Sequence, residues 1–164
     1  MCIRDRIKVS VFEFESQAYI YDSMLKASSA IYNIKQGERE SVNEYRKRFR
    51  EQFEMLEHYR GSFGKDEGLV LEEYRRAGME IKSDTIDCNS RTHKRMEEKA
   101  KQRAEGMILL KNADTRRFGV LLVELENNFS RRVDQYPKDM TEAYNLLVKH
   151  TPPPNNNNKS RRDK

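Results

Sequence analysis

A helix start followed by apolar residues at helical spacing is the feature that most restricts the fold of this chain. Ser41 and Glu44 have the spacing of a capping box. In this motif the serine hydroxyl accepts the backbone N–H of the glutamate three residues later, and the glutamate carboxylate accepts the backbone N–H of the serine. Glu44 is also four residues before Arg48, a spacing that allows an ion pair on the helix flank. Apolar side chains then recur every three or four residues. The pattern predicts a helical core from Val42, Tyr45, Phe49, Phe53 and Leu56.

The densest apolar run lies between residues 113 and 150. Asp114 can cap one helix there, and Asp139, with a glutamate three residues later, can cap another. Tyr136 and Pro137 separate the two, because the residue before a proline favours an extended backbone. Gly119 suggests a close helix crossing. We therefore predict a helical hairpin that builds a second core from Phe118, Leu121, Leu122, Leu125, Leu146 and Leu147.

The remaining segments also favour helices. We expect them over residues 7–35 and 69–81, and a longer one that begins near residue 91 and continues into the apolar run 107–110. The predicted fold is all-α, with a domain over residues 7–150. Glycines in 61–68 and the polar cluster at 82–92 are two candidate boundaries between small lobes.

The two ends of the chain differ from this domain. Residues 1–6 look unrelated to the sequence that follows, and we expect them to be non-native. Residues 151–164 are rich in proline and asparagine and end in a basic run, which predicts a disordered linker.

Composition points to an ordinary intracellular protein. Hydrophobic and charged residues each make up 36% of the chain, whose net charge is +5. Two cysteines are too few for a disulfide framework or a zinc cluster, and no apolar run approaches the roughly 18 residues of a membrane span. We expect a location in the cytoplasm or nucleus and no membrane partner.

The chemistry-bearing residues do not form a recognised catalytic or metal-binding pattern. His58, His93 and His150 fall in different segments, without a nucleophile or carboxylate at a known spacing. We therefore expect no enzyme activity, no cofactor, no metal and no small-molecule substrate. Phosphate binding needs only positive charge, which makes the tail residues candidate RNA contacts: Lys159, Arg161, Arg162 and Lys164. The basic residues of 91–105 alternate with glutamates, which favours a solvated helix.

Two stretches resemble a known family. Residues 35–49, read KQGERESVNEYRKRF, look like a signature in the capsid region of Gag proteins from LTR retrotransposons. Residues 111–129, followed by 134–137 and 141–147, are similar to the later part of Gag-like capsids from copia-type elements of diatoms, other algae or protists. The resemblance spans roughly residues 30–150, with the stretches in the family's order.

The resemblance implies an all-helical capsid protein that self-assembles into a shell around RNA, with itself and non-specific RNA as partners. One departure is that such proteins often carry a CCHC zinc knuckle after the capsid, whereas this chain has no cysteine after Cys88. We expect either a fragment that ends in the linker, or RNA binding that rests on the basic tail. The alternative is a helical nucleic-acid-binding or adaptor protein that uses the 91–105 helix and the tail.

Overall fold

The computed structural model describes residues 17–59, 61–79 and 90–150. These residues form six helices and no strand, so the all-α prediction is confirmed for this part of the chain. The predictions for residues 1–6 and 151–164, and the first part of the predicted 7–35 helix, fall outside the described residues. The helices are α2 (Gln17–Asn33), α3 (Val42–His58), α4 (Glu67–Arg76), α5 (Arg91–Lys111), α6 (Thr115–Ser130) and α7 (Met140–Lys149).

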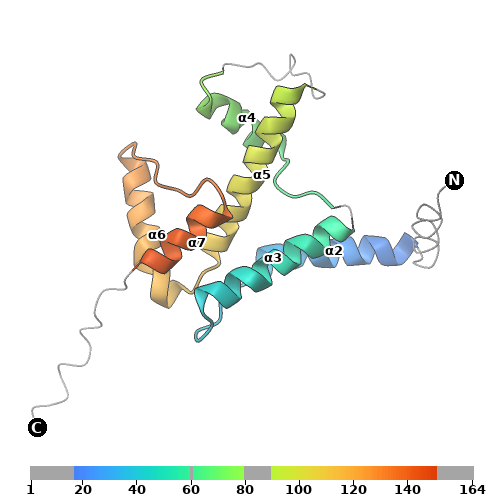
Figure 1. Cartoon of the computed structure of the whole chain (residues 1–164), viewed down its shortest axis with the longest axis horizontal. Coiled ribbons are helices and arrows are strands. Elements are labelled where there is room, and N and C mark those ends of the chain that lie inside the picture. The colour runs from blue at the N-terminus through green and yellow to red at the C-terminus, as the bar shows by residue number, and fades with distance from the viewer. Residues whose placement is uncertain (1–16, 60, 80–89, 151–164) are drawn as a thin grey trace, which may run out of the picture.

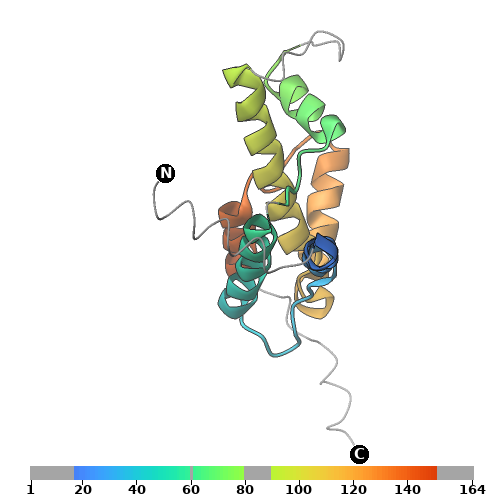
Figure 2. The ribbon, with the colours of Figure 1, turned by 90° about the vertical axis from the view of Figure 1, so that its right-hand side faces the viewer.

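The longest described helix, α5, connects the parts of the fold. α2 and α3 run antiparallel beside each other, α4 lies against the first half of α5, and α7 packs on α5 and on α3 (Figures 1 and 2). The first half of α2 extends away from the other described helices (Figure 1). α5 runs from its Ser90 cap into the apolar run at its end as one helix, as expected.

The two predicted cores are one core. Tyr45, Phe49, Phe53 and Leu56 belong to the same buried cluster as Phe118, Leu121, Leu125 and Leu147, whereas Val42, Leu122 and Leu146 are partly buried against it. The expectation of two separate cores is wrong because α5 contributes Leu109 and Leu110, both fully buried, to this same cluster.

The predicted hairpin of residues 113–150 is also corrected. α6 and α7 begin at the expected caps, since Asp114 and Asp139 accept hydrogen bonds from backbone amides of their helices. However, α7 packs mainly on α5 rather than on α6. The close approach is at Gly106, where an added Cβ would lie 2.6 Å from the carbonyl oxygen of Asp139. Among the described residues, nothing lies within 4 Å of a Cβ built on Gly119.

A second, smaller cluster joins α4 to α5. It consists of Val70, Tyr74, Met96 and Ala100. The 61–66 loop links the two clusters, because Phe63 belongs to the large one while Gly64, at a φ of +69°, packs against the backbone of Lys101. Most of the other candidate boundary, 82–92, lies outside the described residues.

Candidate functional site

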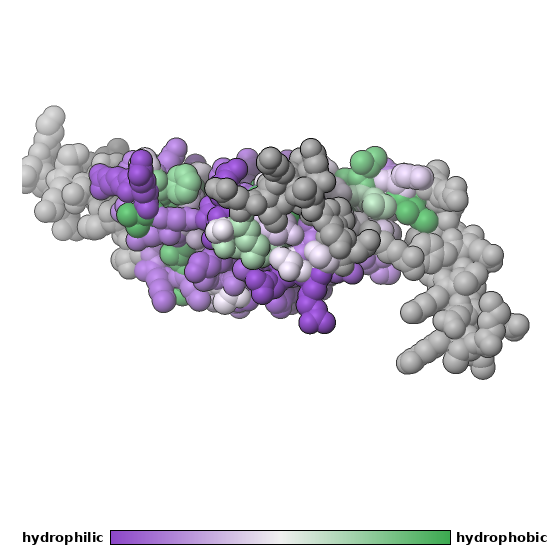
Figure 3. Space-filling model, turned by 90° about the horizontal axis from the view of Figure 1, so that it is seen from above, coloured by the Kyte–Doolittle hydropathy of each residue, from purple (hydrophilic) through white to green (hydrophobic). Residues whose placement is uncertain are grey.

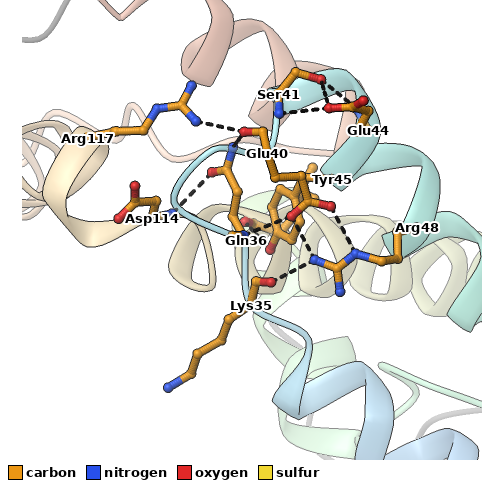
Figure 4. Close-up of polar contacts among 11 residues, drawn as sticks. Lys35, Gln36, Glu40, Ser41, Glu44, Tyr45, Arg48, Asp114 and Arg117 are labelled. Carbon is orange, nitrogen blue, oxygen red and sulfur yellow. Dashed lines mark hydrogen bonds and ion pairs between the residues drawn. The ribbon is translucent and has the colours of Figure 1, made fainter.

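A polar cluster fixes the segment between α2 and α3 to the turn between α5 and α6 (Figure 4). Gln36, which is only 7% exposed, lies at its centre. Its side-chain amide donates to the carbonyl of Glu40 at 3.1 Å, and its side-chain oxygen accepts from the backbone N–H of Asp114 at 3.1 Å. The backbone N–H of Gln36 also donates to the carbonyl of Asn112 at 2.9 Å. Two of these three hydrogen bonds, those with Asn112 and Asp114, hold together two turns that are distant in the sequence.

Arg48 belongs to the same cluster and bonds to both ends of the segment between α2 and α3 (Figure 4). Its guanidinium donates to the Glu40 carboxylate at 2.9 and 2.8 Å and to the Lys35 carbonyl at 2.7 Å. These hydrogen bonds hold the pKa of Glu40 below its usual value. The predicted pair of Glu44 with Arg48 is wrong, because the Glu44 carboxylate accepts from the backbone of Ser41 in the capping box.

The two stretches that carry the family resemblance meet at this cluster. From the second stretch, Arg117 donates to the carbonyl of Glu40 at 2.8 Å. Beside it, the hydroxyl of the fully buried Tyr45 donates to the carbonyl of Leu109 at 3.0 Å, and burial raises the pKa of Tyr45. These polar side chains therefore hold the fold together.

An exposed apolar stripe runs along α2. Tyr21, Leu25 and Tyr32 are 71%, 70% and 59% exposed, while Ala27 and Ile31 on the opposite side of the helix are buried in the core. Spacings of four and seven residues place the three exposed side chains on one helix face. Seen from above, apolar surface gathers at the end of the molecule where the projecting half of α2 lies (Figure 3). The stripe is an apolar surface that no described segment covers.

A cavity of about 320 Å³ lies at the end of this stripe. Tyr32 forms part of its wall, with its ring 5.5 Å from the ring of Phe63. Leu69, Met107 and Ile108 add apolar surface from α4 and α5. The charged side chains of the wall include Glu73 and Arg103, which pair with each other at 2.5 Å, while most of the exposed wall surface is apolar. The cavity therefore suits an apolar group.

The basic residues of the predicted 91–105 helix fall into two groups. Lys101 bonds to Glu57 of α3 and Arg103 to Glu73 of α4, both at 2.5 Å, so these two cations hold helices together. The others are exposed and make no ion pair with any described residue: Arg91, Lys94, Arg95 and Lys99. The tail candidates Lys159, Arg161, Arg162 and Lys164 lie outside the described residues.

The three histidines remain apart. His58 is exposed on α3, His93 lies 3.4 Å from the Tyr74 hydroxyl, and His150 packs beside Phe118. Within the described ranges, no three His, Cys, Asp or Glu side chains converge as metal ligands. No helix in those ranges combines the length and apolarity needed to cross a membrane.

Among the described residues, one carboxylate has a raised pKa. Glu105 lies in a groove between α3, α5 and the start of α7, and burial raises its pKa to about 7. The ammonium of Lys101, 3.9 Å away, lowers the pKa less than burial raises it. The neighbouring acids Glu57 and Glu98 add repulsion that favours the protonated form.

Sequence reasoning placed the buried faces of α3, α6 and α7 but did not identify the stripe or the cavity. Tyr21 and Leu25 lie in the predicted 7–35 helix, where the spacing of apolar residues did not separate the buried face from the exposed one. Comparison of the chain with protein-family models, with curated proteins and with solved structures finds no match.

Proposed function

We propose that this chain is a structural protein of the Gag capsid type, whose copies associate into a particle that packages RNA. The observation that carries the proposal is the exposed apolar stripe of Tyr21, Leu25 and Tyr32 on α2, which no helix or loop in the described ranges covers. Apolar area exposed to water is a cost that association removes, and large exposed patches mark interaction surfaces.

The resemblance supports the same proposal from different residues. The stretches 35–49 and 111–129 provide the capping box, the buried aromatic face and the Gln36 cluster, which together fix how α2 and α3 sit on the turn before α6. Residues that keep a helical subunit in one shape are what a repeating shell requires, because every copy must present the same surfaces to its neighbours. In this proposal the chain works by packing and not by catalysis.

Exposed positive charge supports the RNA-binding part of the proposal. The exposed cations Arg91, Lys94, Arg95 and Lys99 occupy the first half of α5, and four more basic residues belong to the tail. Contacts of this kind bind phosphates without reading sequence, and they weaken as salt rises. Lys101 and Arg103 are excluded from this role because their charges are held by acids of other helices.

The proposal is tested by the mass of the purified chain in solution. Light scattering coupled to size-exclusion chromatography should show an average mass that rises with protein concentration, at low salt and at high salt. Persistence of apolar association at high salt is expected because screening weakens exposed charges but not apolar burial. A mass of 19.5 kDa, equal to one chain, at every protein and salt concentration would contradict the proposal.

A further inference from the structure

The apolar stripe carries both halves of a self-complementary contact. Its first half holds projecting side chains, Tyr21 and Leu25, and its other end leads through Tyr32 into the 320 Å³ cavity. The distance along α2 from Tyr21 to Tyr32 is about 16 Å, at a rise of about 1.5 Å per residue. Ser28 lies between them on the same face.

We infer that a second copy of this chain covers the stripe, with the two α2 helices antiparallel about a twofold axis near Ser28 and Ser29. Leu25 of each copy is then level with Tyr32 of the other, and Tyr21 and Leu25 reach toward the other copy's cavity. A twofold contact uses the same patch on both copies, so protruding and hollow parts must lie on one surface, as they do here. The inference rests on the proposed self-association and identifies its surface.

The charges on α2 favour a copy of the chain over a charged partner. Asp22 and Lys26 are the charged residues of this helix, and they pair with each other at 2.5 Å, so α2 itself has no net charge. The same twofold axis brings Asp22 of one copy to the end of α2 in the other, which the exposed Lys35 follows two residues later. Opposite charges therefore meet at the edges of the contact, and small serines at the crossing allow the helices to approach closely.

The cavity has the size and lining for such a contact. About 320 Å³ is at the small end of the range for ligand sites, roughly 300 to 1,000 Å³, and is suited to side chains. The wall contributed by Phe63, Leu69 and Met107 is apolar. Glu73 is paired with Arg103, and Glu72 with Arg75 and Arg76, while the two other charged residues of the wall, Asp66 and Lys111, are exposed. An entering Leu25 can therefore contact the apolar part of the wall.

Two exposed positions test the contact on the full chain. Leu25→Asp places a charge on the protruding half, and Leu69→Asp places one at the cavity, where Leu69 is 43% exposed and its replacement is compatible with folding. Val123→Asp on α6, 56% exposed and outside the stripe, is the matched control. In sedimentation equilibrium we expect each stripe variant to raise the dissociation constant at least about tenfold, a change of about 1.4 kcal/mol, and the control to leave it unchanged. A mixture of the two stripe variants should associate more tightly than either alone, because one of its two contacts is intact.

A cysteine at the axis provides an independent measurement if a charged variant does not fold. Ser28→Cys, in a chain with Cys2→Ser and Cys88→Ser, should form an intermolecular disulfide under mild oxidation, whereas Glu51→Cys on α3 should not. A chain that associates with no effect of Leu25→Asp, Leu69→Asp or Ser28→Cys would overturn this interface and leave self-association standing. A chain that stays monomeric would overturn both.

Discussion

The backbone N–H of Asp114 donates a 3.1 Å hydrogen bond to the side-chain oxygen of Gln36, 78 residues earlier in the chain. Gln36 follows α2 and Asp114 caps α6, so this contact connects the start of the fold to its second half. Replacing a buried polar side chain leaves its partners without hydrogen bonds, which costs more than the bonds themselves contribute.

Gln36→Ala should lower the free energy of unfolding by about 2 kcal/mol, because the amide of Asp114 and the carbonyl of Glu40 lose their partner. Urea denaturation followed by circular dichroism measures the change. Lys35→Ala is the neighbouring control, since that side chain is exposed, and its effect should stay within about 0.5 kcal/mol. Equal effects of the two substitutions would contradict the role given to Gln36.

Two of the helical glycines, Gly106 in α5 and Gly119 in α6, should respond in opposite directions to replacement by alanine. Gly106→Ala puts a methyl group 2.6 Å from the Asp139 carbonyl, so α7 must move away from α5 at a cost of about 1 to 3 kcal/mol. Gly119→Ala meets no described neighbour within 4 Å and should stabilise α6 by about 1 kcal/mol through helix propensity. Thermal denaturation of both variants decides the matter. A stabilised Gly106 variant would place the helix crossing elsewhere.

These two glycines also show where sequence reasoning stops. Local rules found the caps at Ser41, Asp114 and Asp139, because a cap is a relation between residues two or three apart. The same rules could not place the close crossing, since Gly106 is packed by a loop more than thirty residues later. Arg48 likewise pairs with Glu40 and not with Glu44, because the Glu44 carboxylate accepts the backbone N–H of Ser41 in the capping box.

The core was predicted better than its connectivity. Periodicity marks which face of a helix is buried, and it identified Tyr45, Phe49, Phe53 and Leu56 correctly as buried residues. It does not say which helix covers that face, so the contribution of Leu109 and Leu110 that merges the two predicted cores was not foreseen. The stripe on α2 was missed for the same reason, because exposure depends on the neighbours.

Phe49→Ala should be among the most destabilising single substitutions in α3. The ring is fully buried and lies 5.0 Å from Phe53 and 6.1 Å from Tyr45, so its removal opens a cavity at a cost of about 3 to 5 kcal/mol. Met55→Ala, on the same helix and 48% exposed, should change stability by about 0.5 kcal/mol or less. Chemical denaturation compares the pair, and a Phe49 variant as stable as the Met55 variant would exclude the ring from the core.

Glu105 should lower the free energy of unfolding as the pH rises from about 4.5 to about 7. Burial raises its pKa from 4.5 to about 7, so the folded protein holds this proton more tightly than the unfolded chain does. Both states are protonated below about pH 4.5; above that value the unfolded chain releases the proton first, and the cost to the fold is complete above about pH 7. Glu105→Gln removes this titration while Lys101, Glu57 and Glu98 remain.

The melting temperature of Glu105→Gln should therefore rise relative to that of the original chain between pH 4.5 and 7, and the difference should then be constant. Glu54→Gln, an exposed position on α3, should show no such trend. A constant difference between Glu105→Gln and the original chain across this range would mean that Glu105 is not buried as described.

Electron microscopy of the full chain mixed with RNA, combined with nuclease digestion, tests capsid-type assembly most directly. Assembly predicts closed particles of regular size that protect RNA from the nuclease, with protection lost in Leu25→Asp if the α2 stripe is an assembly contact. Particles should not depend on RNA sequence, because phosphate contacts do not read bases. Absence of particles together with complete digestion of the RNA, at concentrations where the chain is folded, would contradict the proposed function.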